Sequence, residues 1–160
     1  SQAAAQPSEP LDFPAQITLG GDKIDLRPMT GYDRAAMLDF ARSLPPHDLL
    51  FLRRDITQPE VVEDWARDLQ EDRYVTIVAL RGTQIVGYAT VASDGLAWTR
   101  HVAELRVLVS PSMRGLQLGR ILTEQAFVIA RQRGVRKMIA QMTLDQRAAM
   151  RVFNHIGFEK

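Results

Sequence analysis

Residues 103–125, which read AELRVLVSPSMRGLQLGRILTEQ, contain the pattern that decides how this chain folds. The segment Val102–Val109 reads as a strand, and Pro111 ends it because proline has no N–H to donate to a β-ladder. A long helix with one apolar face is expected from about Gln117 to Arg133, and Gly134 ends it. The sequence therefore predicts a strand, a tight loop and a helix start in direct succession.

The start of this helix is a candidate anion-binding site. The first turn of a helix exposes N–H groups that have no partner inside the helix, at the positive end of its dipole. Gly115 and Gly119 would let the backbone approach phosphates closely, and Arg114 and Arg120 add positive charge. The alternative is a joint whose glycines serve only the turn. The Walker and Rossmann nucleotide motifs do not fit, because their residue spacings are absent.

The segments on either side of this joint predict one mixed α/β domain. Its expected elements, in order, are two short strands around the turn at 20–22, a helix capped by Thr30 or Asp33 that ends before Pro45, a connector at 49–55, a helix that begins at Pro59, strands at 74–80 and 85–91, the joint itself, a strand at 137–142 and a helix at 144–156. This order predicts a mixed sheet with helices on both faces.

Composition excludes several classes of site. The chain has 160 residues, 46% of them apolar, which is enough for one core without metal or disulfide support. The absence of cysteine excludes disulfides, thiolate zinc sites and a cysteine nucleophile. A net charge of +1 gives no general attraction to nucleic acid or to an anionic membrane. Without a long apolar run or a secretory pattern, a cytoplasmic location is expected.

Residues 1–15 have a different composition from the rest of the chain. They combine small residues and glutamine with three prolines, which disfavour both helix and sheet. We therefore expect a flexible tether at 1–15, which would join a domain at 16–160 to a larger chain.

Two motifs resemble those of the GCN5-related N-acetyltransferase (GNAT) family. The run VSPSMRGLQLGRIL at 109–122 is similar to that family's acetyl-CoA signature, Arg/Gln-x-x-Gly-x-Gly/Ala after a strand, and NHIGF at 154–158 is similar to its closing motif. The element order from Ile24 to Phe158 also fits, so the resemblance covers most of the chain. It implies an enzyme that moves an acetyl group from acetyl-CoA to an amine without a metal.

The resemblance also implies which residues bind acetyl-CoA. In the family this molecule lies between two splayed strands, and its pantetheine bonds the backbone before the loop. The implied contacts here are Val107, Leu108 and Val109 on the strand, Arg114, Gly115, Leu116, Gln117, Leu118, Gly119 and Arg120 in the loop and helix start, and Gln146 and Phe153 near the end. Gln117 replaces a usual glycine and Gln146 a frequent asparagine. Phe153 replaces a frequent tyrosine, so a hydroxyl that would protonate the departing thiolate is missing.

Glu104 is the candidate general base, because ELRVLV resembles the segment whose glutamate has that role in histone-type relatives. Direct attack by the amine in a ternary complex is favoured, since the chain has no cysteine to carry the acetyl group. Arg106 lies two residues on, on the same face of the strand, and would weaken Glu104 as a base if the two point at each other. A purely structural Glu104–Arg106 pair is therefore the alternative interpretation.

The acceptor and the assembly stay open at the level of sequence. The acceptor amine is a protein lysine, a protein N-terminus or a small amine. Residues 45–55 lie where the corresponding segment of related enzymes determines which acceptor is bound. They faintly resemble that segment in protein-lysine acetyltransferases that are fused to larger chains. The family's last two strands do not follow Phe158, which predicts a homodimer, a swapped terminus or a continuation of the chain. The alternative function is a non-catalytic acyl-CoA-binding regulatory domain.

Overall fold

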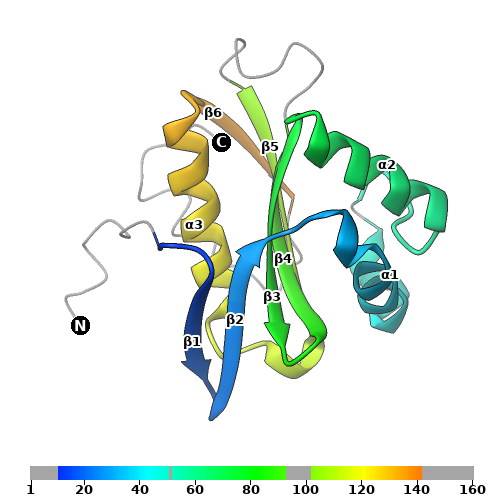
Figure 1. Cartoon of the computed structure of the whole chain (residues 1–160), viewed down its shortest axis with the longest axis vertical. Helices are drawn as coiled ribbons and strands as arrows, with labels where there is room; N and C mark the ends of the chain where they lie inside the picture. Colours follow the sequence, from blue (N-terminus) through cyan, green and yellow to red (C-terminus); the bar gives the residue numbers. More distant parts are fainter. Residues whose placement is uncertain (1–10, 51, 93–101, 142–160) are drawn as a thin grey trace.

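The fold is a six-stranded sheet with helices on both faces, in a computed structural model that describes residues 11–50, 52–92 and 102–141 (Figure 1). The strands lie in the order of the sequence: β1 (Ala15–Leu19), β2 (Asp22–Pro28), β3 (Tyr74–Arg81), β4 (Gln84–Ala92), β5 (Val102–Val109) and β6 (Lys137–Gln141). Neighbours pair antiparallel except β5 and β6, which are parallel. The predicted mixed, mostly antiparallel sheet is confirmed.

Tight turns connect the antiparallel strands where the sequence places glycine. Between β1 and β2, Gly20 and Gly21 have φ of 58° and 86°, a region that glycine enters without steric cost. Gly82, with φ of 66°, has the same role between β3 and β4. The parallel β5–β6 pair instead needs a long crossover, which α3 (Leu118–Gln132) provides.

The three helices divide between the two faces of the sheet (Figure 1). Helix α3 packs with Val107 and Leu105 on one face. Helices α1 (Arg34–Ser43) and α2 (Pro59–Gln70) pack with Leu108 on the other. Because side chains alternate along a strand, Glu104 and Arg106 share the face of Leu108. Both polar side chains of β5 therefore lie on the face that α1 and α2 cover.

A glycine sets how closely α3 approaches the sheet. A Cβ atom at Gly87 would lie 3.1 Å from the Leu108 carbonyl oxygen, 3.2 Å from Leu118 and 3.3 Å from Leu122. Any side chain here would push the start of α3 away from β4. Gly87 therefore holds the first turn of α3 beside the end of β5.

Short 3₁₀ turns join the longer elements: η2 (Gly31–Asp33), η3 (Pro46–Leu49) and η5 (Pro111–Met113). Thr30 caps the first turn, and α1 then begins at Arg34. The helix start at Pro59 is confirmed. Thr30 caps the η2 turn that leads into α1, whereas the N-cap of α1 itself is Asp33, which makes no side-chain capping hydrogen bond to α1. No helix of the described ranges is long and apolar enough to cross a membrane.

The tether at 1–15 needs a correction at its end. The Leu11 N–H donates to Gln125 Oε1 at 3.1 Å, and Leu11 and Phe13 pack against the core. The prolines leave these apolar side chains free to pack against the core, and β1 begins at Ala15, so residues 11–15 are part of the folded domain. The helix expected at 144–156, with Gln146 and Phe153, lies outside the described residues.

Candidate active site

The end of β5 presents backbone groups on its side away from β4. The Ser110 N–H donates to the Val86 carbonyl at 2.8 Å, in register with the β4–β5 pairing. Alternation then directs the Leu108 N–H toward β4 and those of Val107 and Val109 away from it. The described pairing with β6 ends at Arg106 and Gln141, and a parallel ladder that ends there uses the Val107 N–H, so no described strand pairs with the Val107 carbonyl or with the Val109 N–H. An extended ligand could bond there.

The loop after β5 leads straight into an uncapped helix start. Gly115 has φ of 81°, and Gln117 adopts the left-handed conformation at φ 72° and ψ 8° as the N-cap of α3. The Gln117 side chain makes no capping hydrogen bond. The N–H groups of the first turn of α3, from Leu118 onward, are therefore not used by this cap and suit an anion.

Two leucines of the loop anchor it to the rest of the domain. Leu118 is fully buried in the core under α3. Leu116 packs against the same core, and its Cδ1 lies 2.9 Å from where a Cβ of Gly20 would stand. Both side chains thus hold the loop in place. At these two positions a ligand would therefore contact the backbone rather than the side chain.

The two arginines expected to supply positive charge both have carboxylate neighbours. Arg114 Nη2 donates to Asp48 Oδ2 at 2.6 Å, and Asp48 is only 1% exposed. His47 Nε2 lies 3.2 Å from the other oxygen of Asp48. Arg120 Nε lies 3.6 Å from Glu124 Oε2, one turn along α3. The charge of Arg114 is thus balanced by a buried carboxylate, whereas that of Arg120 is balanced more loosely.

Glu104 lies between two arginines. Its Oε1 accepts a hydrogen bond from Arg106 Nη2. Its Oε2 lies 3.2 Å from Arg53 Nε, yet this buried atom accepts no hydrogen bond within the described part of the chain. The side chain is 12% exposed. The Glu104–Arg106 contact on which the structural interpretation depends is therefore formed. Oε2 of Glu104 can still accept a hydrogen bond.

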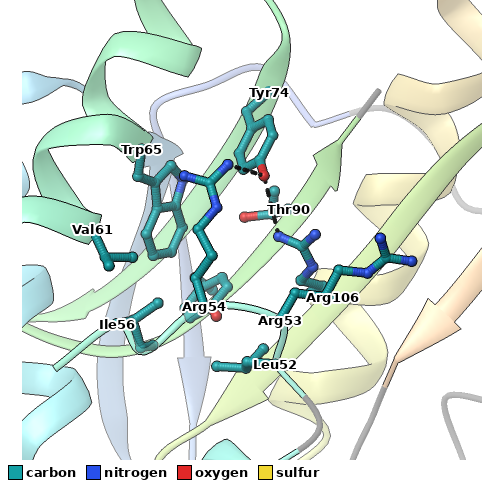
Figure 2. Close-up of a pocket in the computed structure, with 10 residues that line it drawn as sticks. Leu52, Arg53, Arg54, Ile56, Val61, Trp65, Tyr74, Thr90 and Arg106 are labelled. Carbon is teal, nitrogen blue, oxygen red and sulfur yellow. Dashed lines mark hydrogen bonds between the residues drawn. The ribbon is translucent and has the colours of Figure 1, made fainter. Parts of the chain in front are cut away.

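A small pocket opens beside this pair on the face of α1 and α2 (Figure 2). Its apolar wall includes Trp65 and Tyr88, whose rings meet edge to face at 4.9 Å. Trp65 Nε1 donates to Thr76 Oγ1 at 3.0 Å, and this hydroxyl shares a 2.8 Å hydrogen bond with that of Thr90. Burial raises the pKa of Tyr88 far above its ordinary value, so its hydroxyl stays protonated.

The polar rim of this pocket centres on Tyr74. Its hydroxyl accepts from Arg54 Nη2 at 3.1 Å and from Arg106 Nη1 at 3.4 Å, as the dashed lines in Figure 2 show. Burial lowers the pKa of Arg106, but the hydrogen bond that Arg106 donates to Tyr74 and the charge of Glu104 outweigh this effect, so the net pKa is raised. Arg106 is therefore permanently charged.

The sequence analysis did not single out Arg53, Arg54 or Tyr74. Residues 49–55 were expected to form a connector, within the range 45–55 that was expected to shape the choice of acceptor, but no single residue of it was named. Two adjacent arginines after the apolar run Leu49–Leu52 are a signal that such a segment faces a polar site. Tyr74 reads as an ordinary strand residue. Among the described residues, no group of histidine, aspartate and glutamate side chains could hold a metal ion.

Comparisons with known proteins agree with this geometry. Residues 37–158 match the model of the acetyltransferase (GNAT) family. The chain is similar to the GNAT domain of S. lividans PAT, with 19% identity, a TM-score of 0.69 and coverage of 89% of this chain and 86% of that one. It is also similar to the ribosomal-protein-alanine N-acetyltransferase of Brucella melitensis (26%, 0.62, 84% and 83%).

A third solved structure, yncA of Salmonella typhimurium with its cofactor acetyl-CoA, is 23% identical, with a TM-score of 0.62 and coverage of 84% of this chain and 78% of that one. No curated protein was found to match the sequence. The family match spans most of the chain, from the middle of α1 past the last described strand, and includes β5, the loop and α3. This chain therefore belongs to the acetyltransferase (GNAT) family.

Proposed function

We propose that this protein transfers the acetyl group of acetyl-CoA to the nitrogen of an amine. The observation that carries the proposal is the succession at the end of β5: the Val107 carbonyl and the Val109 N–H on the side away from β4, beyond the pairing with β6, then a left-handed Gln117 and an uncapped helix start. Backbone donors along a strand suit the amides of pantetheine, and donors at a helix start suit a pyrophosphate. The Salmonella relative solved with acetyl-CoA supports the same ligand here.

The residues at the end of β5 and at the start of α3 would bind acetyl-CoA and orient it. The Val107 carbonyl and the Val109 N–H would bond pantetheine or the thioester, and the Val109 N–H would polarise the thioester carbonyl as a single-donor oxyanion hole. The loop from Arg114 to Arg120 would hold the phosphates through its backbone. Gln146 and Phe153 remain predicted contacts. When bound, acetyl-CoA supplies an acetyl group activated as a thioester.

Glu104 is the proposed proton acceptor. An amine must lose a proton before it can attack, and the buried Oε2 of Glu104 has an unused lone pair on the face where the pocket opens. The amine nitrogen then bonds to the acetyl carbon while the carbon–sulfur bond breaks. The nitrogen gives its second proton to water, and water supplies the proton that the thiolate takes. The side chain that would otherwise supply that proton is absent at Phe153.

The experiment is to mix the protein with acetyl-CoA and a panel of amines and to measure the release of free thiol. Thiol release that depends on the amine supports transfer. Gly119→Asp should weaken acetyl-CoA binding at least about tenfold by calorimetry, because it adds a carboxylate to the phosphate site. Unchanged affinity in this variant would contradict the loop assignment.

A second candidate function is a non-catalytic acyl-CoA-binding regulatory domain. The engagement of Glu104 by Arg53 and Arg106 favours it, because both arginines compete with a substrate amine for the carboxylate oxygens. Tight binding of acetyl-CoA with no amine-dependent thiol release across the panel would support this candidate over the enzyme.

A further inference from the structure

Three arginines gather on the face of the sheet where Glu104 lies, and we call Arg53, Arg54 and Arg106 the arginine cluster. Figure 2 shows the guanidinium groups of Arg54 and Arg106 directed at the Tyr74 hydroxyl, and Arg53 extending away from it. Both directed groups also lie over the Tyr74 ring, 5.8 Å and 5.7 Å from its centre. Tyr74 thus holds two of the three charges in place.

The cluster borders two adjoining pockets. The pocket of Figure 2 has a volume of only about 20 Å³, which is room for about one water molecule. The second, which we call the Glu104 pocket, has a volume of about 330 Å³ and is lined by the whole cluster together with Glu104 and Tyr74. A cavity of that size accepts a small organic molecule.

Positive charge exceeds negative charge around both pockets. No described acidic residue lines the pocket of Figure 2, and Glu104 is the one described acid in the lining of the Glu104 pocket. Asp68, which pairs with Arg54 at 3.3 Å, also accepts two hydrogen bonds from Arg73. Each nearby carboxylate is therefore shared between two arginines, and the lining keeps excess positive charge.

The cluster also has unused hydrogen-bonding capacity. The Nε of Arg106 is buried and has no hydrogen-bond partner in the described part of the chain. Arg53 is 68% exposed and forms an ion pair with Glu104. A buried N–H without an acceptor is unfavourable, so the site favours a ligand that brings an acceptor oxygen.

We propose that the Glu104 pocket binds the acceptor substrate and that this acceptor is a small amine that also carries a carboxylate. The identity of the ligand as an acceptor rests on the proposed function. A simple ammonium ion would enter a cationic lining and be repelled. A carboxylate on the same molecule turns the net repulsion into attraction, because the planar guanidinium group of Arg53 or Arg54 can donate two parallel hydrogen bonds to a carboxylate.

The same binding event would free the proposed base. A substrate carboxylate competes with Glu104 for Arg53, and the loss of that ion pair exposes Oε2 of Glu104 to the substrate ammonium group. One proton then moves from the ammonium nitrogen to Oε2, which leaves a neutral amine and a neutral carboxylic acid. Arg106 keeps its hydrogen bond to Oε1 and orients the carboxyl group.

The test compares amines in matched pairs. Linear amino acids with two to four carbons between nitrogen and carboxylate are each set against the corresponding primary amide, and kcat/KM for thiol release is measured. We expect at least one acid to exceed its amide by about tenfold or more. The double variant Arg53→Gln/Arg54→Gln should reduce that ratio to about one and leave acetyl-CoA affinity unchanged. The control Arg67→Gln, an exposed arginine of α2, should keep the ratio.

A binding arm separates this inference from the proposed function. The hydroxy acids that correspond to the amino acids carry no amine, and their binding is measured by calorimetry against their amides. Preference for the acids that disappears in the double variant supports the subsite even if no amine is acetylated. Equal binding of acids and amides, or a preference that survives the double variant, overturns it. Acetylation of acidic peptides but of no small acid would also overturn the small-molecule acceptor.

Discussion

The Glu104 side chain has two possible roles that a single substitution separates. Glu104→Gln keeps the shape and the hydrogen bond from Arg106 but removes the proton acceptor. If Glu104 is the base, kcat at neutral pH should fall about 100-fold while acetyl-CoA affinity stays the same. The control is Glu63→Gln, which removes an exposed carboxylate of α2 that pairs with Arg34. A wild-type rate for Glu104→Gln across pH 6–9 would assign Glu104 a structural role.

Gln117 has a strained backbone conformation. It lies in the loop from Arg114 to Arg120, which we propose to hold the phosphates and call the phosphate loop. Its φ of 72° costs a residue with a side chain about 1–2 kcal/mol, whereas glycine has no such cost but loses about 0.5–1 kcal/mol in chain entropy. Gln117→Gly should therefore raise the free energy of unfolding by up to about 1 kcal/mol. Gln117→Val should lower it by about 1–2 kcal/mol, because β-branched residues tolerate this region least. Urea denaturation of both variants measures the difference, and equal stabilities would contradict the strain.

At the scale of elements, the turn before α1 depends on one aspartate. Asp33 accepts from the Thr30 N–H at 2.9 Å and from both terminal nitrogens of Arg27, at 2.8 Å and 2.7 Å. The hydrogen bond from Arg27 is the main reason that the pKa of Asp33 lies below its ordinary value, and the Thr30 N–H lowers it further against the opposing effect of burial. The ionised carboxylate of Asp33 therefore stabilises the folded state.

Asp33→Asn should accordingly lower the free energy of unfolding by about 1–2 kcal/mol at pH 7. Because the folded pKa is depressed, this contribution is complete above the unfolded value of about 4 and is lost as pH falls toward the folded pKa. The gap between wild type and variant should therefore shrink at pH 3. Urea denaturation at pH 7 and pH 3 measures it, with the exposed α1 residue Asp39 changed to Asn as the control. A gap independent of pH would exclude this linkage.

How far sequence predicts an element depends on whether its signal is local. The bounds of β5 and the start of α2 follow the prediction, because alternation, Pro111 and Pro59 act within a few residues. Turn η3 and the individual residues of the arginine cluster were not predicted, because their signal is not local. Their meaning comes from contacts with β3 and β5, such as those of Arg54 with Tyr74 and Arg53 with Glu104, and nothing in the local pattern encodes these partners.

On the scale of the whole molecule, a buried ion pair connects the two halves of the candidate active site. Asp48 in η3 and Arg114 in the phosphate loop are 66 residues apart in the chain. Asp48 belongs to the segment that continues into Arg53 and Arg54, and Arg114 to the segment that leads into α3. Sequence analysis assigned Arg114 to phosphate binding, but its partner shows that it also holds the loop against η3.

Breaking this pair should unfold the protein more easily and loosen the phosphate loop. Asp48→Asn should lower the free energy of unfolding by about 3 kcal/mol, because it removes the charge of a carboxylate that is 1% exposed and that pairs with Arg114 at 2.6 Å. In a double-mutant cycle with Arg114→Gln, the coupling energy should exceed about 1 kcal/mol. The control cycle of Arg120→Gln and Glu124→Gln, a partly exposed pair 3.6 Å apart, should give less than about 0.5 kcal/mol.

Acetyl-CoA affinity in Asp48→Asn then decides between two effects of opposite sign. Release of Arg114 from Asp48 makes its charge available to phosphates, which would tighten binding. Loss of the anchor lets the loop and its backbone donors move, which would weaken binding by the cost of ordering them again. We expect the second effect to dominate, because the donors at the start of α3 act only when the loop is fixed, and calorimetry should show affinity at least about fivefold weaker. Tighter binding would instead mean that Asp48 restrains a phosphate-binding arginine rather than supporting the loop.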